Sequence, residues 1–443
     1  MSLKNSTKSI HLILHKAKNS FPGIFFILKW ALICMIPGVI IGTASAGFLL
    51  SLDWATHFRE QHPMVILALP LAGFMVGLIY HYFGKNIEGG NNLLIDTIHD
   101  PKKLIPFRMA PLIYFGTFIT HIFGGSAGRE GTAVQMAGAL GFPFAKLFRL
   151  DHQQKQILII SSVAAGFGSV FGTPLAGAVF GLEFFFIGKI KYQAILPSFF
   201  AAIIASLTTD LWQVHHTTYF ISSIPNISFV RLGYSIIAGL IFGLCAASFS
   251  KLMHFGTKFF KENLRFPPLR PLVGGFMIVF LIILIGSTKY IGLGVPVILK
   301  AFEQQASPYD FLIKILLTVI TLSSGFKGGE VTPLFFIGAT LGSALSFFIP
   351  LPASLLAGMG FVAVFSGAAN TPLACMLMGI ELFGIQPGIY IAIACIVAYL
   401  MSGHTGIYGR QLIGEPKNTL FEKDRNQQLN LLNKSKDETA ANP

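Results

Sequence analysis

The feature that most constrains this chain is a series of uncharged apolar runs. Each reaches the roughly 18 residues that indicate a bilayer-spanning segment. They lie at 30–52, 62–84, 157–182, 232–250 and 271–288, and from 331 to 409 the only Asp, Glu, Lys or Arg is Glu381. Only 12% of the residues are charged, about half the usual share in soluble domains. The sequence therefore predicts an all-α polytopic membrane protein and excludes a water-soluble fold.

The formal net charge of +13 does not predict nucleic-acid binding, because the cations are spread between apolar runs and do not form one patch. They fit the positive-inside bias of membrane proteins. Every charged residue before Asp53 is basic, which predicts a cytoplasmic N-terminus. A cleaved secretory signal ending near Ala44-Ser45-Ala46 is the alternative, but the segment before Trp30 is much longer than the basic region of a signal peptide.

We expect three parts: a basic cytoplasmic segment at 1–29, a transmembrane domain at 30–410 and a polar cytoplasmic tail at 411–443. Gly and Pro interrupt the apolar segments of the transmembrane domain, as in Ile36-Pro37-Gly38, Gly172-Thr173-Pro174 and Ala369-Asn370-Thr371-Pro372. We therefore expect broken or partial helices as well as full spans.

The transmembrane domain contains an internal repeat, which divides it into approximate halves at 30–225 and 226–410. The tetrapeptide TPLA begins at 173 and again at 371, and Gly-x-Glu at 181–183 recurs at 379–381 with the same spacing. GREGT at 128–132 is matched by GGEVT at 328–332. Repeated halves with interrupted helices are typical of transporters that bind their substrate near the middle of the membrane.

The strongest local signal is GGSAGREGT at 124–132, a glycine-rich turn that opens into an apolar helix. Glycines allow backbone N–H groups to converge, and a helix N-terminus adds partial positive charge, so the turn around Gly128, Arg129 and Gly131 can hold a small anion. The carboxylate of Glu130 would compete for that position and would leave when protonated. The alternative is an Arg129–Glu130 ion pair in a surface loop.

The related segment GFKGGEVTP at 325–333 also leads into an apolar helix, whose first turn suits Pro333. Backbone donors at Glu330 and Val331, helped by the hydroxyl of Thr332, would bind an anion here. A plain loop with an N-terminal cap at Thr332 is an equally weighted alternative.

Two further segments supply polar donors. EGGNN at 88–92 places Asn91 ahead of an amphipathic helix that runs toward Asp100. Its amide would serve as an ordinary cap on local grounds alone. Tyr408 ends the last apolar run and offers one phenolic donor, and its alternative is an aromatic residue at the membrane interface.

No pattern predicts a metal or other cofactor. The four cysteines, Cys34, Cys245, Cys375 and Cys395, lie in apolar segments without paired spacing. The sequence has no His-Glu-x-x-His or P-loop motif. An intramembrane enzyme that uses Glu130 as general acid or base is the distant alternative to transport.

Together these segments resemble the CLC family of chloride channels and anion/proton antiporters over most of 30–410. EGGN at 88–91 lies where the family has its first anion-site turn, and GREG at 128–131 matches its gating-glutamate signature. GTPLAG at 172–177 matches a helix start, GGEVTP at 328–333 matches the later anion-site turn, and Tyr408 falls where the family has its central tyrosine. The resemblance implies two inverted repeats with broken and tilted helices, a homodimer with one pore per subunit, helix N-termini that point at a central anion, and Glu130 as the external gate.

Departures from the chloride pattern resemble the fluoride-exporting branch of the family. Asn91 replaces the usual serine, Leu94 replaces a proline, and Thr132 replaces the proline that ends the gating signature. Phe184 stands where proton-coupled chloride exchangers have an internal proton-accepting glutamate, and the fluoride branch also lacks that group.

We therefore expect a proton-coupled antiporter that exports fluoride in a bacterial inner membrane, with both termini in the cytoplasm. Fluoride is small and strongly hydrated, so donors from Asn91, Thr332 and Tyr408 suit it. A chloride/proton exchanger and a passive chloride channel of the same family remain the alternatives, since these motifs do not separate a channel from an exchanger.

Overall fold

The computed structural model describes residues 22–100 and 103–432, and helices account for most of this part of the chain. The predicted all-α polytopic membrane fold is confirmed. The first half comprises α2 (Pro22–Gln61), η1 (Pro63–Ala68), α3 (Leu69–Phe83), α4 (Asn91–His99), α5 (Met109–Ile122), α6 (Glu130–Gly141), α7 (Phe144–Leu147), α8 (His152–Phe171), α9 (Pro174–Glu183), β1 (Phe186–Ile187), η2 (Tyr192–Ala194) and α10 (Ile195–Leu211). The second half comprises α11 (Phe229–Asn263), α12 (Leu269–Ile285), α13 (Val295–Glu303), α14 (Asp310–Ser323), α15 (Val331–Leu345), α16 (Ala353–Ala369), α17 (Pro372–Phe383), α18 (Gly388–Met401), β2 (Leu412–Ile413) and η3 (Thr419–Asp424).

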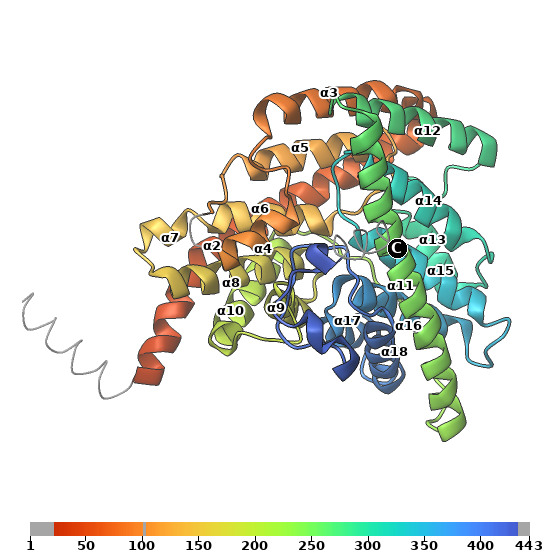
Figure 1. Ribbon diagram of the computed structural model, residues 1–443. Helices are drawn as coiled ribbons and strands as arrows, with labels where there is room; N and C mark the ends of the chain where they lie inside the picture. Colours follow the sequence, from red (N-terminus) through yellow and green to blue (C-terminus); the bar gives the residue numbers. More distant parts are fainter. Residues whose placement is uncertain (1–21, 101–102, 433–443) are drawn as a thin grey trace, which may run out of the picture.

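The two halves repeat one order of long and short helices, as the internal repeat predicts. The opening helices α2 and α11 have 40 and 35 residues, α4 and α13 have 9 each, and α5 and α14 have 14 each. In Figure 1 helices α6 to α10 lie on the left and α13 to α18 on the right, with the long α11 crossing the view from top to bottom.

Two carboxylates at equivalent positions of the repeats make reciprocal contacts between the two halves. Glu183, at the end of α9, accepts hydrogen bonds from the backbone N–H groups of Leu373 (3.2 Å) and Ala374 (2.8 Å) at the start of α17. Glu381, near the end of α17, accepts them from Leu175 (3.0 Å) and Ala176 (2.8 Å) at the start of α9. Each half therefore caps a helix of the other, as expected for inverted repeats.

Four of the described helical segments are long and apolar enough to cross a membrane: Gly23–Gln61, Pro63–Phe83, Tyr192–Leu211 and Phe229–Asn263. Shorter apolar helices fill the space between them, including α5, α9, α12 and α15 to α18. Partial helices are compatible with a membrane where their ends are buried in protein or line a cavity.

The predicted interruptions at two of the three Gly/Pro sites are present. Helix α8 ends at Gly172, whose φ of 67° lies in the left-handed region, and α9 begins at Pro174. Helix α16 likewise ends at Asn370, with φ 59°, and α17 begins at Pro372. In both cases a left-handed residue ends the helix and a proline begins the next one.

The expectation of a break at Ile36-Pro37-Gly38 is wrong, because α2 continues through Pro37. A proline removes one backbone hydrogen bond, which a long helix tolerates when neighbouring helices pack against it. Gly38 serves such packing: a Cβ there would lie 2.9 Å from the Ile204 side chain of α10. The glycine therefore permits a close helix contact and does not mark an end.

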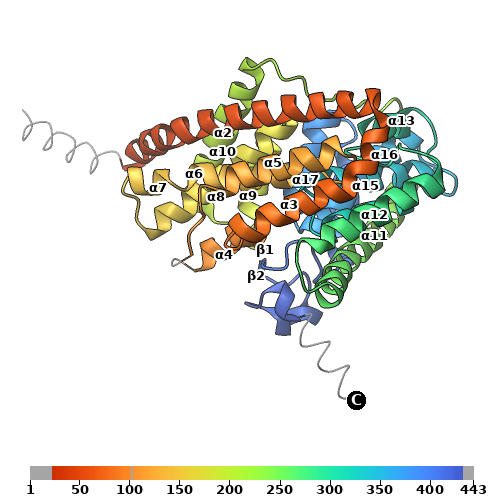
Figure 2. The same ribbon diagram turned by 90° about the horizontal axis from the view of Figure 1, so that it is seen from above.

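The core is formed by closely packed helices such as α15 and α16. A Cβ on Gly338 would lie 2.0 Å from the carbonyl oxygen of Gly360, so this contact requires glycine. Near the end of the described chain, β2 pairs in parallel with β1, Leu412 opposite Phe186 and Ile413 opposite Ile187. Figure 2 shows this pair beside the segment that leads to the C-terminus. Residues 1–21 and 433–443, which hold most of the expected N-terminal segment and the last third of the expected tail, lie outside the described residues. The boundaries at 29 and 410 stay predictions.

Candidate functional site

The two repeated glycine turns meet at the centre of the protein. Gly128 and Gly329 exchange backbone hydrogen bonds, with N to O distances of 2.6 and 2.7 Å. Helix α6 begins at Glu130 and α15 at Val331, so two helix N-termini start from one junction. Each contributes N–H groups that have no partner within their own helix, together with partial positive charge, to the same small volume, which favours a bound anion.

The carboxylate of Glu130 lies at the N-terminus of α15. It accepts a hydrogen bond from the backbone N–H of Thr332 at 3.0 Å, and the Thr332 hydroxyl lies 2.6 Å from both carboxylate oxygens. The Glu130 residue is fully buried. A carboxylate thus occupies the position that the helix N-terminus offers to an anion.

Arg129 holds the same carboxylate from the other side. Its backbone N–H lies 3.2 Å from Oε2 of Glu130, and its Nε lies 3.3 Å from Oε1. The ion pair predicted as an alternative therefore exists, but a surface location is wrong, because the Glu130 side chain has no exposed area. The turn is buried inside the protein, despite its two charged residues, because apolar segments flank it on both sides.

Thr332 does not act as the cap of its own helix. The N-cap of α15 is Glu330, and Thr332 is the second residue of the helix. Its hydroxyl turns toward Glu130, since the carboxylate is the stronger acceptor. The alternative of a plain loop capped by Thr332 is therefore wrong.

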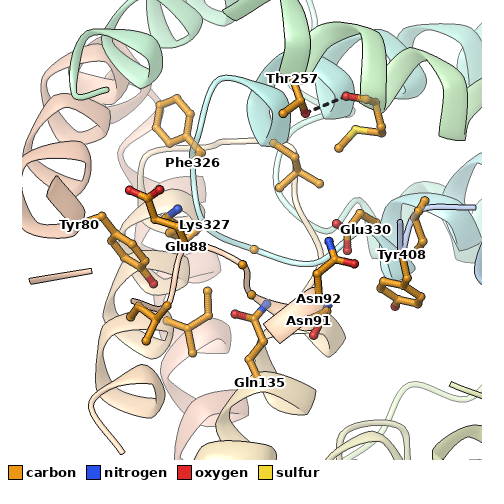
Figure 3. Close-up of a pocket in the computed structure, with 18 of the residues that line it drawn as sticks. Tyr80, Glu88, Asn91, Asn92, Gln135, Thr257, Phe326, Lys327, Glu330 and Tyr408 are labelled. Carbon is orange, nitrogen blue, oxygen red and sulfur yellow. Dashed lines mark hydrogen bonds between the residues drawn. The ribbon is translucent and has the colours of Figure 1, made fainter. Parts of the chain in front are cut away.

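A cavity of about 250 Å³ brings Asn91, Glu330 and Tyr408 together on one side of this junction. Asn91 is the first residue of α4, and its Oδ1 has no hydrogen-bond partner in the described chain. The Asn91 side chain packs closely against α6: a Cβ added to Gly131 would lie 3.2 Å from the Asn91 amide nitrogen. Figure 3 shows Asn91, Asn92, Glu330 and Tyr408 grouped at one end of this first cavity.

Tyr408 is buried, with 2% of its surface exposed, so an interfacial position is excluded. Its ring packs against the edge of Phe184, 4.9 Å between centroids at 70°, and both Glu330 and Glu130 lie within electrostatic range of its phenol group. Phe184, which replaces the expected glutamate, is itself fully buried. It therefore supports the tyrosine and offers no titratable group.

Sequence reasoning missed Gln411, which fixes the chain just after Tyr408. Its amide nitrogen donates to the carbonyl oxygens of Phe184 (3.1 Å) and Ala369 (2.9 Å), and its amide oxygen accepts from Asn370 (3.1 Å). Gln411 is fully buried. Nothing in the local sequence separates it from the polar residues of the tail that follows.

A second cavity, of about 570 Å³, lies on the other side of Glu130. Its wall includes three cationic side chains, Arg59, Arg129 and Lys289, and two acidic ones, Asp53 and Glu60. The two cavities share no lining residue. Because Arg129 lines the second cavity and the Glu330 end of α15 lines the first, the Glu130 carboxylate lies between them.

Inverted helical halves, with a buried carboxylate between two separate cavities, define an ion-translocating membrane protein. The chain belongs to the CLC family, because the family model described as voltage gated chloride channel matches residues 72–403.

Individual relatives extend over nearly the whole chain. A protein of Pseudomonas syringae pv. tomato named "Chloride/fluoride channel protein" is 49% identical over 88% of each sequence. The crystal structure of a CLC-type fluoride/proton antiporter superposes with a TM-score of 0.84 at 35% identity, covering 87% of this chain and 98% of that one. A slow cyanobacterial Cl⁻/H⁺ antiporter has the same fold, with a TM-score of 0.75 at 20% identity over 84% of this chain and 94% of that one.

Proposed function

We propose that this protein exports fluoride in exchange for protons, with Glu130 as the side chain that alternates with the anion and carries the proton. The observation that carries this proposal is the position of the Glu130 carboxylate on the N-terminus of α15, bound by Thr332. Two negative groups cannot share these donors, so an anion can enter only when Glu130 leaves.

Protonation provides the reason for Glu130 to leave. The neutral acid loses its charge-assisted hydrogen bonds with Thr332 and its attraction to Arg129. An anion then takes over the N–H and hydroxyl donors of Thr332. Glu130 then returns to the N-terminus of α15 and releases its proton on the side of the membrane opposite the one from which the proton came. The returning carboxylate expels the anion, so the proton and the anion move in opposite directions.

Asn91 and Tyr408 support fluoride as the anion. With Thr332 they supply an amide N–H₂, a phenol and an alcohol hydroxyl, all buried and able to make short hydrogen bonds to a small, strongly hydrated ion. The names of the 49% identical relative and of the 35% identical antiporter structure agree with this proposal. Chloride is the second candidate, because other relatives, such as ClcB of Escherichia coli at 25% identity, are named chloride channels.

The direction of export follows from a proposed orientation in a bacterial inner membrane, with both termini in the cytoplasm. The second cavity is lined by several residues between 53 and 60, at the far end of α2, so a cytoplasmic start of α2 places this cavity outside. The first cavity is lined by Ile407 and Tyr408 beside the C-terminal segment, which makes it the cytoplasmic entrance.

We also propose a homodimer with one pore per subunit, as the family resemblance implies. Both cavities, Glu130 and all of its hydrogen-bond partners come from one chain. This arrangement is compatible with one pore in each subunit.

Proteoliposomes loaded with fluoride test the function. A fluoride electrode and a pH-sensitive dye should record fluoride release together with proton uptake. Glu130→Gln should abolish the proton movement, because an amide cannot carry a titrating proton. Absence of release with both fluoride and chloride would refute transport. Chloride release without fluoride release would refute only the choice of anion, and fluoride release without proton movement in the unmodified protein would favour a passive channel.

A further inference from the structure

Lys327 is a cation in the wall of the first cavity that the mechanism above does not use. It belongs to the same loop as Glu330, and its Nζ lies 4.0 Å above the ring centroid of Tyr80. In the described part of the chain its ammonium group forms no hydrogen bond or ion pair with a protein acceptor. Figure 3 shows Lys327, Tyr80 and Glu88 grouped at one end of the cavity and Glu330 and Tyr408 at the other.

The position of Lys327 is fixed by packing along its stem. A Cβ added to Gly116 of α5 would lie 2.8 Å from Cγ of Lys327, so the helix approaches the aliphatic part of the side chain closely. The Tyr80 ring, which is largely buried, holds the other end through a cation–π contact. The ammonium group is therefore held at the cavity wall and does not extend freely into water.

The other charged groups near Lys327 are arranged around the entrance. Glu88 is exposed and lies within electrostatic range of the ammonium group, as does the exposed Lys261 of α11, which does not line the cavity. Deeper in the cavity the Glu330 carboxylate would repel an entering anion, and His254 also contributes to the wall. Among the described residues, Lys327 is the only Lys or Arg that lines this cavity.

We propose that Lys327 is an anion-capture residue, which binds a small inorganic anion inside the first cavity before the anion reaches Asn91, Thr332 and Tyr408. Under the proposed function, on which this inference rests, that anion is cytoplasmic fluoride. An ammonium group is a compact charge with three donors and suits a small, strongly hydrated anion. A cationic group in a cavity with low-dielectric walls raises the local concentration of anions and their rate of entry. Glu88 opposes this attraction and limits how long the anion stays.

Everted membrane vesicles test the capture step, because they expose the cytoplasmic face of every copy to the bath. Fluoride uptake into an acidic lumen is measured against bath fluoride concentration. Lys327→Gln should raise KM for fluoride about tenfold while kcat changes less than twofold, and Lys327→Arg should restore most of the affinity. Glu88→Gln should lower KM, since it removes the opposing charge. Lys261→Gln, which removes one exposed charge outside the cavity, should change KM less than twofold.

The outcomes separate this inference from the proposed function. No fluoride uptake by the unmodified protein would overturn the proposed function itself. Normal uptake with an unchanged KM in Lys327→Gln, or a loss of kcat alone, would overturn the capture role. An equal effect of Lys261→Gln would also overturn it, because the effect would then reflect general surface charge. Should Lys327→Gln fail to fold, Glu88→Gln decides, and an unchanged or raised KM in that variant refutes the inference.

Discussion

Glu130 and Glu330 occupy equivalent positions in the two repeats, yet their carboxylates have opposite environments. Both oxygens of Glu130 are hydrogen-bonded across to the second half, whereas Oε2 of Glu330 is buried without a hydrogen-bond partner among the described residues. The threonine two positions further on explains the difference. Thr332 reaches Glu130, while its counterpart Thr132 pairs with the hydroxyl of Thr117 at 2.7 Å.

The repeat therefore supplies two helix N-termini, but only one of the two carboxylates, that of Glu130, is hydrogen-bonded to the other half of the protein. A symmetric arrangement would place negative charge on both, and two neighbouring carboxylates disfavour each other's ionised form. Under the proposed function, the asymmetry leaves Glu130 as the one carboxylate that exchanges with the anion.

Thr332→Val should slow fluoride transport about ten- to a hundredfold. The substitution keeps the shape of the side chain but removes the hydroxyl that lies 2.6 Å from the Glu130 carboxylate. A hydrogen bond to a charged group contributes about 1.5–3 kcal/mol, which corresponds to that range of rates. Fluoride efflux from proteoliposomes measures it.

Thr132→Val is the matched control, since it removes the equivalent hydroxyl of the first repeat. That hydroxyl contacts Thr117 and not a carboxylate, so transport should fall less than about threefold. Equal losses in the two variants would contradict a specific role for Thr332.

Asn91→Ser should reduce the preference for fluoride over chloride about tenfold. The amide offers two N–H donors from the buried wall of the first cavity, and serine offers one shorter donor. The loss of one hydrogen bond, about 1.4 kcal/mol, corresponds to a tenfold change. Efflux rates for the two ions, measured in parallel, give the ratio.

Asn92→Ser controls for the loss of an amide at this turn. The Asn92 side chain accepts a hydrogen bond from the backbone N–H of Arg410 at 3.1 Å, so it serves the connection between two segments. Its replacement should lower the rates for both ions together. A selectivity that is the same in Asn91→Ser as in the unmodified protein would refute the role assigned to Asn91.

The sequence alone predicted the parts of this fold that depend on local chemistry. The uncharged runs at 30–52, 62–84 and 232–250 overlap three of the four described segments that are long enough to span a membrane, but no predicted run corresponds to Tyr192–Leu211. Gly172-Thr173-Pro174 located a real helix boundary because a left-handed glycine and an N-terminal proline act within a few residues. Pro37 misled the same reasoning, since the contacts that keep α2 continuous come from α10, far along the chain.

The site was predictable only in part for the same reason. Glycine turns and Glu130 carry a local signature, but the contact between Glu130 and Thr332 joins residues about two hundred positions apart. Gln411 and Lys327 have no local signature at all. Their importance arises from groups brought to them by the fold, namely the carbonyl groups of Phe184 and Ala369 for Gln411 and the Tyr80 ring for Lys327.

Gln411→Leu should destabilise the protein by about 3 kcal/mol or more. It leaves the carbonyl oxygens of Phe184 and Ala369 and the amide of Asn370 without these partners, and each buried unpaired group costs about 1–3 kcal/mol. Thermal unfolding in detergent should show a lower midpoint. The exposed Gln427 is the control, and Gln427→Leu should change stability by less than about 0.5 kcal/mol. Equal midpoints for the two variants would contradict the anchoring role of Gln411.

Glu183→Gln and Glu381→Gln should each destabilise the protein by about 1–2 kcal/mol. Each carboxylate accepts two backbone N–H groups at the start of a helix in the other half. An amide keeps one acceptor oxygen and loses the charge that favours a helix N-terminus. The loss should be larger for Glu183, which is 7% exposed, because less water is available to replace the lost bond.

The double variant tests whether these two caps act independently. They share no hydrogen-bond partner, so their effects on the free energy of unfolding should add within about 0.5 kcal/mol. Glu415→Gln, at an exposed carboxylate paired with Arg425, should cost less than about 1 kcal/mol. Fluoride transport by the folded single variants should stay within about twofold of the unmodified protein, because neither carboxylate lines the first or the second cavity. A variant of normal stability that has lost transport would show that the cap belongs to the ion pathway, and would require a role for these carboxylates beyond joining the two halves.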